Sequence, residues 1–210
     1  RDEIATTWPV ASEVPLILAD SHDRTSLDAM AAQTTVVCTT VGPFAKYGSE
    51  LVASCIAQGT HYCDITGEVQ WIRRMIDAHH EDAVTAGIRI VPCCGFDSIP
   101  SDLGTLMLQE AAVKSTGSPC SRIALHVIKT RGGASGGTIA SMLNVLEEAK
   151  DPTVRKILGH PYSLNPTGER KGPDGPDQRS VKKDPVTGTW TGPFVMEATN
   201  ARIVRRSNAL

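Results

Sequence analysis

The chain has 210 residues, a formal net charge of −2, 40% hydrophobic residues and 21% charged residues. These values are close to those of ordinary globular proteins, so they exclude a wholly disordered chain and indicate one large domain or two small ones. No apolar stretch reaches the roughly 18 residues that a membrane-spanning helix needs. The chain starts at Arg1 without an initiator Met, and we expect the protein to continue beyond both ends.

From residue 16 to about residue 113, one pattern recurs four times. A short apolar run is followed by a polar or glycine-containing turn and then by a stretch with helical periodicity. The predicted strands are residues 16–20, 35–39, 61–64 and 88–93, and the predicted helices are about 26–32, 49–58, 68–86 and 101–113. This alternation predicts right-handed βαβ crossovers and an α/β fold with a doubly wound parallel sheet.

The ends of the predicted helices carry recognisable signals. Thr25 followed three residues later by Asp28 resembles a capping box at the start of the first helix. Gly59 and Gly87 stand just after two other helices, where a left-handed residue ends a helix at low steric cost.

The pattern changes near residue 120, and we place a domain boundary there, between residues 1–120 and residues 121–210. Residues 122–130 predict one longer strand, and a glycine-rich turn and a helical pattern follow it. A long flexible loop rich in Pro and Gly is predicted at about 160–190. The last segment, 193–206, is again predicted to be helical.

Two functions are disfavoured by composition. Aromatic residues make up 4% of the chain and no basic domain is interleaved with them, which argues against nucleic-acid binding. None of the six cysteines forms a C-x-x-C pair and no H-E-x-x-H motif occurs, so we predict no metal site.

Polar or glycine-containing residues follow all four predicted strands. Open parallel sheets bind their ligands beyond the carboxyl ends of the strands. In this chain those ends are residues 20–21, 39–44, 64–68 and 95–98. Loops are polar in any protein, which is the competing explanation.

Several of these turns carry a family resemblance. Gly42-Pro43-Phe44, taken together with Tyr47-Gly48 and the segments 64–68 and 95–102, resembles the saccharopine dehydrogenase-like family. The branch it resembles includes the trans-acting enoyl reductases of lipid assembly. The matching stretches are 36–48, 59–70, 92–103, 131–142 and 192–210, which is most of the chain outside the variable segment 150–190.

The resemblance implies an NAD(P)-dependent oxidoreductase, with part of a Rossmann-like doubly wound sheet followed by part of an α+β substrate domain. It places Asp20, with Ser21 beside it, near the adenine of the cofactor. The residues that it implies for the ribose and pyrophosphate are Thr39, Thr40, Val41, Gly42, Pro43 and Phe44. The residues that it implies for the nicotinamide end are Thr66, Gly67, Glu68, Gly95, Phe96 and Ser98.

One element of that family is absent from this sequence. The motif G-x-G-x-x-G, which seats a pyrophosphate on a helix N-terminus, does not occur, and neither does the strand that separates NAD from NADP. The glycines at 132–137 have a different spacing. We expect the missing elements before Arg1, and we expect residues 1–210 alone to bind the dinucleotide poorly.

Asp97 is the candidate catalytic residue. It lies in the loop that the resemblance places beside the nicotinamide, where a proton must be delivered after hydride transfer. The alternative is that Asp97 or Ser98 caps the helix that Pro100 begins. For Arg205 and Arg206, near the end of the last predicted helix, we favour a structural role over binding of an anionic substrate.

The predicted function is hydride transfer from NADP or NAD, with NADP favoured, to a lipid-linked enoyl or keto substrate. Two alternatives stay open. One is an amino-acid dehydrogenase of the saccharopine type, for which Arg131, Arg202, Arg205 and Arg206 are available as carboxylate anchors. The other is a non-catalytic Rossmann scaffold or binding protein. We expect a cytoplasmic location, and the resemblance is compatible with peripheral membrane or lipid-droplet association and with a homodimer.

Overall fold

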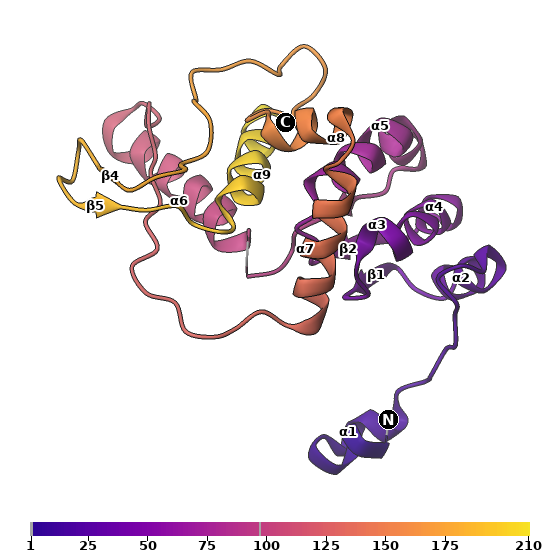
Figure 1. Cartoon of the computed structure of the whole chain (residues 1–210). Coiled ribbons are helices and arrows are strands. Elements are labelled where there is room, and N and C mark those ends of the chain that lie inside the picture. Colours follow the sequence, from indigo (N-terminus) through magenta and orange to yellow (C-terminus); the bar gives the residue numbers. More distant parts are fainter. Residues whose placement is uncertain (1, 97) are drawn as a thin grey trace.

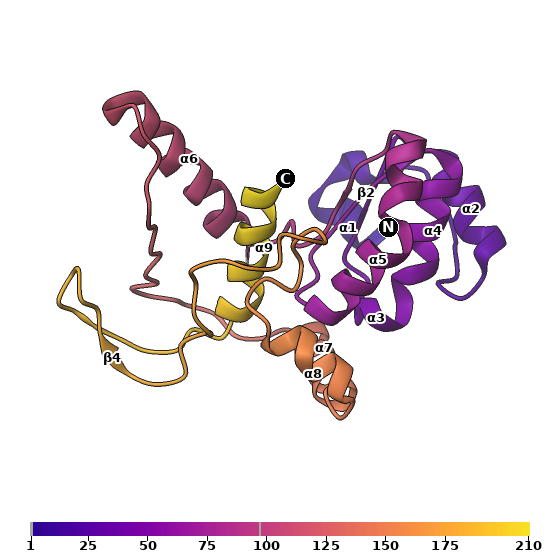
Figure 2. The ribbon, with the colours of Figure 1, turned by 90° about the horizontal axis from the view of Figure 1, so that it is seen from above.

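A computed structural model describes residues 2–96 and 98–210 of the chain. In chain order its elements are α1 (Asp2–Thr7), η1 (Pro9–Glu13), α2 (Arg24–Ala31), β1 (Val36–Thr39), α3 (Phe44–Tyr47), α4 (Ser49–Gln58), β2 (His61–Asp64), α5 (Val69–Ala86), β3 (Ile90–Val91), α6 (Ile99–Thr116), α7 (Gly136–Glu148), α8 (Pro152–Gly159), β4 (Lys182–Lys183), β5 (Trp190–Thr191) and α9 (Glu197–Ala209). Helices α2, α4 and α5 gather around the small sheet, while α6 lies at the far side of α9 (Figures 1 and 2).

The strands β1, β2 and β3 form a parallel sheet in that order. Val36 pairs with His61, and Tyr62 pairs with Ile90. Because α4 connects β1 to β2 and α5 connects β2 to β3, both connections are βαβ crossovers. The prediction of parallel strands in a mixed α/β fold is therefore confirmed for three of the four strands.

The two faces of this sheet differ. Tyr62 and Asp64 point toward the helical side and are almost fully buried. On the other face Val36 and Val91 are about half exposed and Cys38 is exposed. Within residues 2–96 and 98–210, the second helical layer that a doubly wound sheet requires is therefore not observed.

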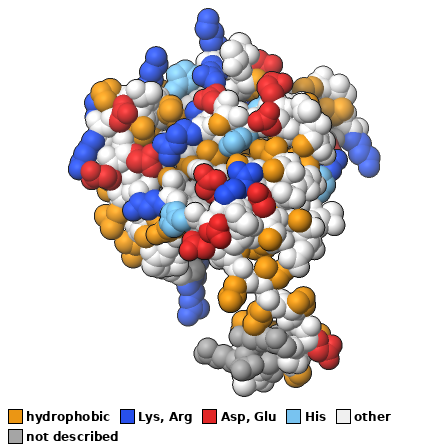
Figure 3. Space-filling model, turned by 90° about the vertical axis from the view of Figure 1, so that its right-hand side faces the viewer, with side chains coloured by type: hydrophobic (Ala, Val, Ile, Leu, Met, Phe, Trp, Pro, Cys, Tyr) orange, Lys and Arg blue, Asp and Glu red, His pale blue; other side chains and the backbone are white. Residues whose placement is uncertain are grey.

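The first predicted strand is wrong. Residues 16–20 are extended but pair with no strand in the described part of the chain, and Leu16 and Leu18 are 66% and 95% exposed. A strand is defined by hydrogen bonds to a neighbour, so apolar composition alone does not make one. The N-terminal segment projects from the body with apolar side chains on its surface (Figure 3).

Helix ends follow the predicted signals in part. Gly59 and Gly87 end α4 and α5 in the left-handed conformation, with φ of 69° and 66°. The capping box at Thr25 is wrong, because the N-cap of α2 is Asp23, whose carboxylate accepts from the Thr25 N–H at 3.0 Å. Asp28 pairs with Arg24 instead.

The second half of the chain corrects two further expectations. Residues 122–130 form no strand, because they have no partner strand among the described residues to supply ladder hydrogen bonds. Leu125 and Ile128 are exposed there. Helix α8 occupies part of the segment taken as variable loop. Between residues 160 and 190 the chain is a loop, apart from β4 and the first residue of β5. The strands β4 and β5 pair antiparallel. That loop is anchored at its start, since Tyr162 and Leu164 are buried.

The predicted helices at the end of the chain are confirmed as α7 and α9. In the described residues, no helix combines the length and the apolar character that crossing a bilayer requires.

Candidate functional site

The carboxyl ends of β1 and β2 lie side by side. Thr39 and Asp64, the last residues of these strands, are register partners and are 7% and 0% exposed. The Thr39 hydroxyl accepts a hydrogen bond from the Val41 N–H at 3.2 Å, which shapes the turn that follows β1. The structure thus places the turns after β1 and β2 at one edge of the sheet, as a parallel sheet demands.

The buried Asp64 side chain connects the loops at this edge through hydrogen bonds. Its carboxylate accepts from the Tyr62 hydroxyl at 2.8 Å and from the N–H groups of Thr66 and Cys93, both at 3.0 Å. Burial raises the pKa of Asp64, and the hydrogen bonds from Thr66, Cys93 and Tyr62 oppose that rise. Asp64 therefore ties the turn after β2 to the end of β3, a role that the sequence reasoning did not assign to it.

Glu68 holds the turn after β1 in place. Its side chain is buried, and its carboxylate accepts from the N–H groups of Phe44 at 2.7 Å and Ala45 at 3.0 Å. The Ser141 hydroxyl of α7 donates to the same carboxylate at 2.9 Å. A carboxylate offers about four acceptor positions, so three are filled by the protein itself. Glu68 therefore positions the turn after β1.

The turn itself contains a cis peptide between Gly42 and Pro43. Thr40 and Val41 are exposed and Gly42 is half-buried, so these residues face outward at the sheet edge. The Phe44 ring is 4% exposed and packs against Trp71 with ring centroids 5.8 Å apart. The Phe44 side chain thus belongs to the core.

Replacing Gly42 by Val tests how tightly the turn is packed. A Cβ at Gly42 would lie 3.2 Å from the Phe44 ring, which is buried against Trp71. We expect Gly42→Val to lower the free energy of unfolding by about 1–3 kcal/mol in urea titrations and to weaken NADPH binding. Gly133→Val is the control, because a Cβ there meets no atom within 4 Å. A stable Gly42→Val protein with unchanged NADPH affinity would contradict the cofactor assignment.

Asp20 and Ser21 lie beside the same turn. The Asp20 carboxylate accepts from the His22 N–H at 2.8 Å, and Asp20 is exposed. The His22 ring contacts the Tyr47 ring of α3 edge-on at 5.6 Å. Although residues 16–20 form no strand, the chain therefore still brings Asp20 and Ser21 close to the helix that follows the Gly42 turn.

The first turn of α9 contacts two more of the predicted residues, Gly67 and Ser98. Thr66 accepts from the Glu68 N–H at 3.1 Å, and the Thr199 hydroxyl donates to the Gly67 carbonyl at 3.1 Å. The Ser98 hydroxyl donates to the Asn200 side-chain oxygen at 3.0 Å.

Sequence reasoning missed Thr199, Asn200 and Ser141. Thr199 and Asn200 fall inside the matching segment 192–210, and Ser141 falls inside 131–142, but no spacing signal singles them out.

The loop before α6 holds the last candidates. Phe96 is 85% exposed and Gly95 is half-buried. Ser98 occupies the N-cap position of α6 but its side chain makes no capping hydrogen bond, so the capping alternative is wrong for the Ser98 side chain. Asp97 lies outside the described residues. Across residues 2–96 and 98–210, no group of three His, Cys, Asp or Glu side chains is arranged to hold a metal ion.

Comparison with known proteins gives relatives over nearly the whole chain. No family model and no solved structure matches it. It is 46% identical over 215 residues to a Mycobacterium tuberculosis (strain H37Rv) protein named as a trans-acting enoyl reductase, covering 99% of this chain and 50% of that protein. It is 39% identical over 218 residues to the trans-acting enoyl reductase of Mycobacterium leprae and 41% identical over 211 residues to that of Mycobacterium bovis (strain BCG / Pasteur 1173P2). These alignments cover 100% and 96% of this chain, and 52% and 50% of the two relatives. The chain spans about half the length of the curated relatives it matches, and all three are named as enoyl reductases.

Proposed function

We propose that this chain is part of an NAD(P)-dependent oxidoreductase that reduces a lipid-linked enoyl or keto group by hydride transfer, with NADP favoured. The observation that supports this proposal most directly is the turn at residues 39–44, which Glu68 holds at the carboxyl edge of a parallel sheet. Relatives named trans-acting enoyl reductase support the reductase assignment. We assign the sheet to a Rossmann-like domain whose remaining strands lie outside this chain.

The residues at this edge fit a dinucleotide. Thr40 and Val41 are exposed and Gly42 has no side chain, so a flat ligand can approach the backbone after β1. The turn is fixed before binding, because Glu68 and Thr39 already hold its N–H groups. Such preorganisation lowers the entropy cost of binding. A bound dinucleotide would supply the hydride.

The chain's own residues would position the substrate, exclude water and deliver a proton. We propose that Phe96, which is 85% exposed, covers one side of the nicotinamide end. Asp97, next to it in sequence, is the proposed proton donor. Seating of the pyrophosphate on a glycine-rich turn would need residues outside this chain, since G-x-G-x-x-G is absent from it.

The ion pairs that two of the candidate arginines form within the protein argue against the amino-acid dehydrogenase alternative. Arg202 is 1% exposed and paired with Asp177, and Arg205 is paired with Asp174. Two of the four cations proposed as carboxylate anchors, Arg202 and Arg205, are thus engaged within the protein. Arg205 also donates to the Pro161 carbonyl, which supports the structural role favoured for it, whereas Arg206 donates to the Leu164 carbonyl and has no carboxylate partner among the described residues.

An assay of the complete protein tests the proposed function. NADPH and a trans-2-enoyl thioester are mixed with the protein, and the loss of nicotinamide absorbance is followed. We expect consumption of NADPH that Asp97→Asn lowers by roughly 10²–10⁴-fold, the usual contribution of general acid–base catalysis, with cofactor affinity unchanged.

The outcomes separate the assignments. Activity of Asp97→Asn within about threefold of the wild type would remove Asp97 as proton donor and leave the capping role. Binding of NADPH without any turnover of enoyl or keto thioesters would favour the non-catalytic scaffold. Absence of dinucleotide binding to the complete protein would contradict the proposed function itself.

A further inference from the structure

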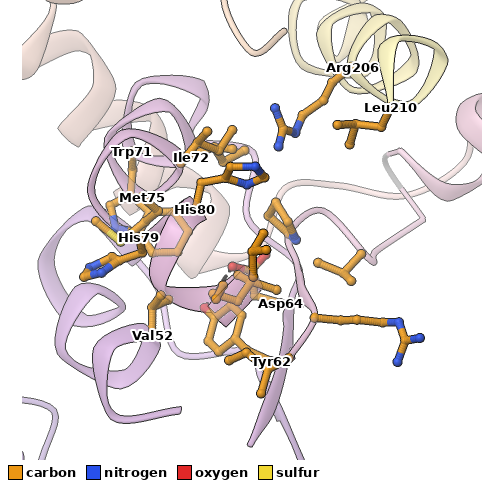
Figure 4. A pocket seen from close by; sticks show the side chains of 18 residues that line it. Val52, Tyr62, Asp64, Trp71, Ile72, Met75, His79, His80, Arg206 and Leu210 are labelled. Atoms are coloured by element: carbon orange, nitrogen blue, oxygen red, sulfur yellow. Dashed lines mark hydrogen bonds between the residues drawn. The ribbon is translucent and has the colours of Figure 1, made fainter. Parts of the chain in front are cut away.

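A cavity of about 310 Å³ lies between α5, the strands β2 and β3, and the C-terminal end of α9. In Figure 4, Val52 and Tyr62 lie on one side of it, and Arg206 and Leu210 lie on the opposite side. Its wall is largely apolar and includes Ile72, Met75 and Ile88. None of the residues assigned to the cofactor lines it, so it is a second site beyond the proposed dinucleotide-binding edge.

The size of the cavity limits what it can hold. An engineered apolar cavity of about 150 Å³ binds benzene, which has six carbons. By that measure a cavity of about 310 Å³ has room for an apolar chain of roughly ten to twelve carbons. It also falls at the lower end of the range of about 300–1,000 Å³ that is typical of small-molecule sites.

The rim of the cavity carries a guanidinium that has no ion-pair partner in the described part of the chain. Arg206 is half-buried and donates to the Leu164 carbonyl at 2.7 Å, but no carboxylate in the described part of the chain forms an ion pair with it. The adjoining hollow is lined by Arg206 together with three acidic residues, Asp77, Glu81 and Asp82. Asp77 is paired with Arg73, and none of the three forms an ion pair with Arg206. Partly buried guanidinium groups are normally matched by an anion. Arg206 therefore lacks the partner that its position calls for.

Other charged groups around the cavity also favour an anionic ligand. Burial, and after it the positive charge of Arg73, lowers the pKa of Arg206. Arg89 lines the cavity as a second cation. Asp64, the acidic side chain in the wall, is already bonded to three donors. An anion at the rim would give Arg206 the ion-pair partner that it lacks among the described residues.

We propose that this cavity binds an amphipathic carboxylate, with an alkyl chain of about ten carbons along the wall formed by Ile72, Met75 and Ile88 and the carboxylate on Arg206. The apolar wall supplies most of the binding free energy through burial of the chain. Arg206 selects an anionic head group, because its planar guanidinium matches a carboxylate.

Calorimetric titration of the complete protein with decanoate tests this site. We expect saturable binding of decanoate, and binding of 1-decanol at least about tenfold weaker, a difference of about 1.4 kcal/mol. Arg206→Gln should bring the affinity for decanoate down to that for 1-decanol. Arg205→Gln is the matched control, because Arg205 pairs with Asp174 and does not line the cavity.

A second variant fills the cavity. Ala83 is buried on the cavity side of α5, whereas Ala86 is exposed on the same helix and does not line the cavity. Ala83→Leu should abolish decanoate binding without lowering the melting temperature, and Ala86→Leu should leave binding unchanged. Absence of saturable binding, equal affinity for decanoate and 1-decanol, or full binding by a folded Ala83→Leu protein would each overturn the proposal. NADPH affinity should be the same in all these variants.

Discussion

Glu68→Gln is expected to destabilise the protein and to weaken NADPH binding together. The Glu68 carboxylate accepts from two backbone N–H groups and from Ser141, whereas a Gln side chain places an NH₂ group where one oxygen stood. A buried N–H donor would then face another donor. We expect a loss of about 2–4 kcal/mol in the free energy of unfolding, since charge-assisted bonds are the stronger ones and an unmatched buried donor costs about 1–3 kcal/mol.

The same change should weaken NADPH affinity at least about tenfold, because the turn at residues 39–44 loses the group that fixes it. Glu148→Gln is the matched control. Glu148 also joins α7 to α5, through Arg74 at 2.6 Å, but it does not touch the Gly42 turn. We expect Glu148→Gln to leave NADPH affinity unchanged. A destabilised Glu68→Gln protein that binds NADPH like the wild type would contradict the role given to the turn.

Arg202→Gln is expected to have the largest effect on stability alone. Arg202 is 1% exposed, and its guanidinium donates to Asp177 and to the carbonyls of Leu158 and His160 at the end of α8. Removing the charge leaves Asp177 unpaired and takes one donor from each of the two carbonyls, while the His160 carbonyl keeps its hydrogen bond from the Ser163 N–H. Breaking a buried ion pair typically costs about 3–5 kcal/mol, and we expect a loss of that order.

Urea unfolding followed by Trp fluorescence measures this loss. Arg205→Gln is the control on the same helix, because the side chains of Arg205 and Asp174 are 18% and 47% exposed, so this pair is more solvated than that of Arg202 and contributes less. We expect a change below about 1 kcal/mol for Arg205→Gln. Equal effects for the two substitutions would show that Arg202 does not anchor α9 to the end of α8.

The parts of the fold that the sequence predicted are those fixed by local patterns. β2 begins two residues after Gly59, and Gly59 and Gly87 mark the helix ends where the structure has them. The two strands that were predicted but are not observed, at 16–20 and 122–130, have suitable residues. They lack a partner strand within the described residues, and pairing is a non-local property.

The candidate site was predicted as a set of loops and not as a set of contacts. The sheet topology brings Thr39 and Asp64 together at one edge, as strand order implies. The Glu68 carboxylate accepts hydrogen bonds from Phe44 and Ser141, which lie 24 and 73 residues away in the sequence. No sequence motif indicates these contacts. The burial of the Phe44 ring against Trp71 likewise depends on packing, since an aromatic residue in a turn suits a ligand or a core equally well.

Amide hydrogen exchange of the complete protein, with and without saturating NADPH, measures the central claim directly. The account predicts that NADPH slows exchange in the peptide containing Thr40, Val41 and Gly42. It predicts no change in a control peptide from the hairpin of β4 and β5, which lies far from the sheet edge (Figure 1). Saturated NADPH binding without slower exchange at residues 40–42 would contradict the assignment of the cofactor to this edge.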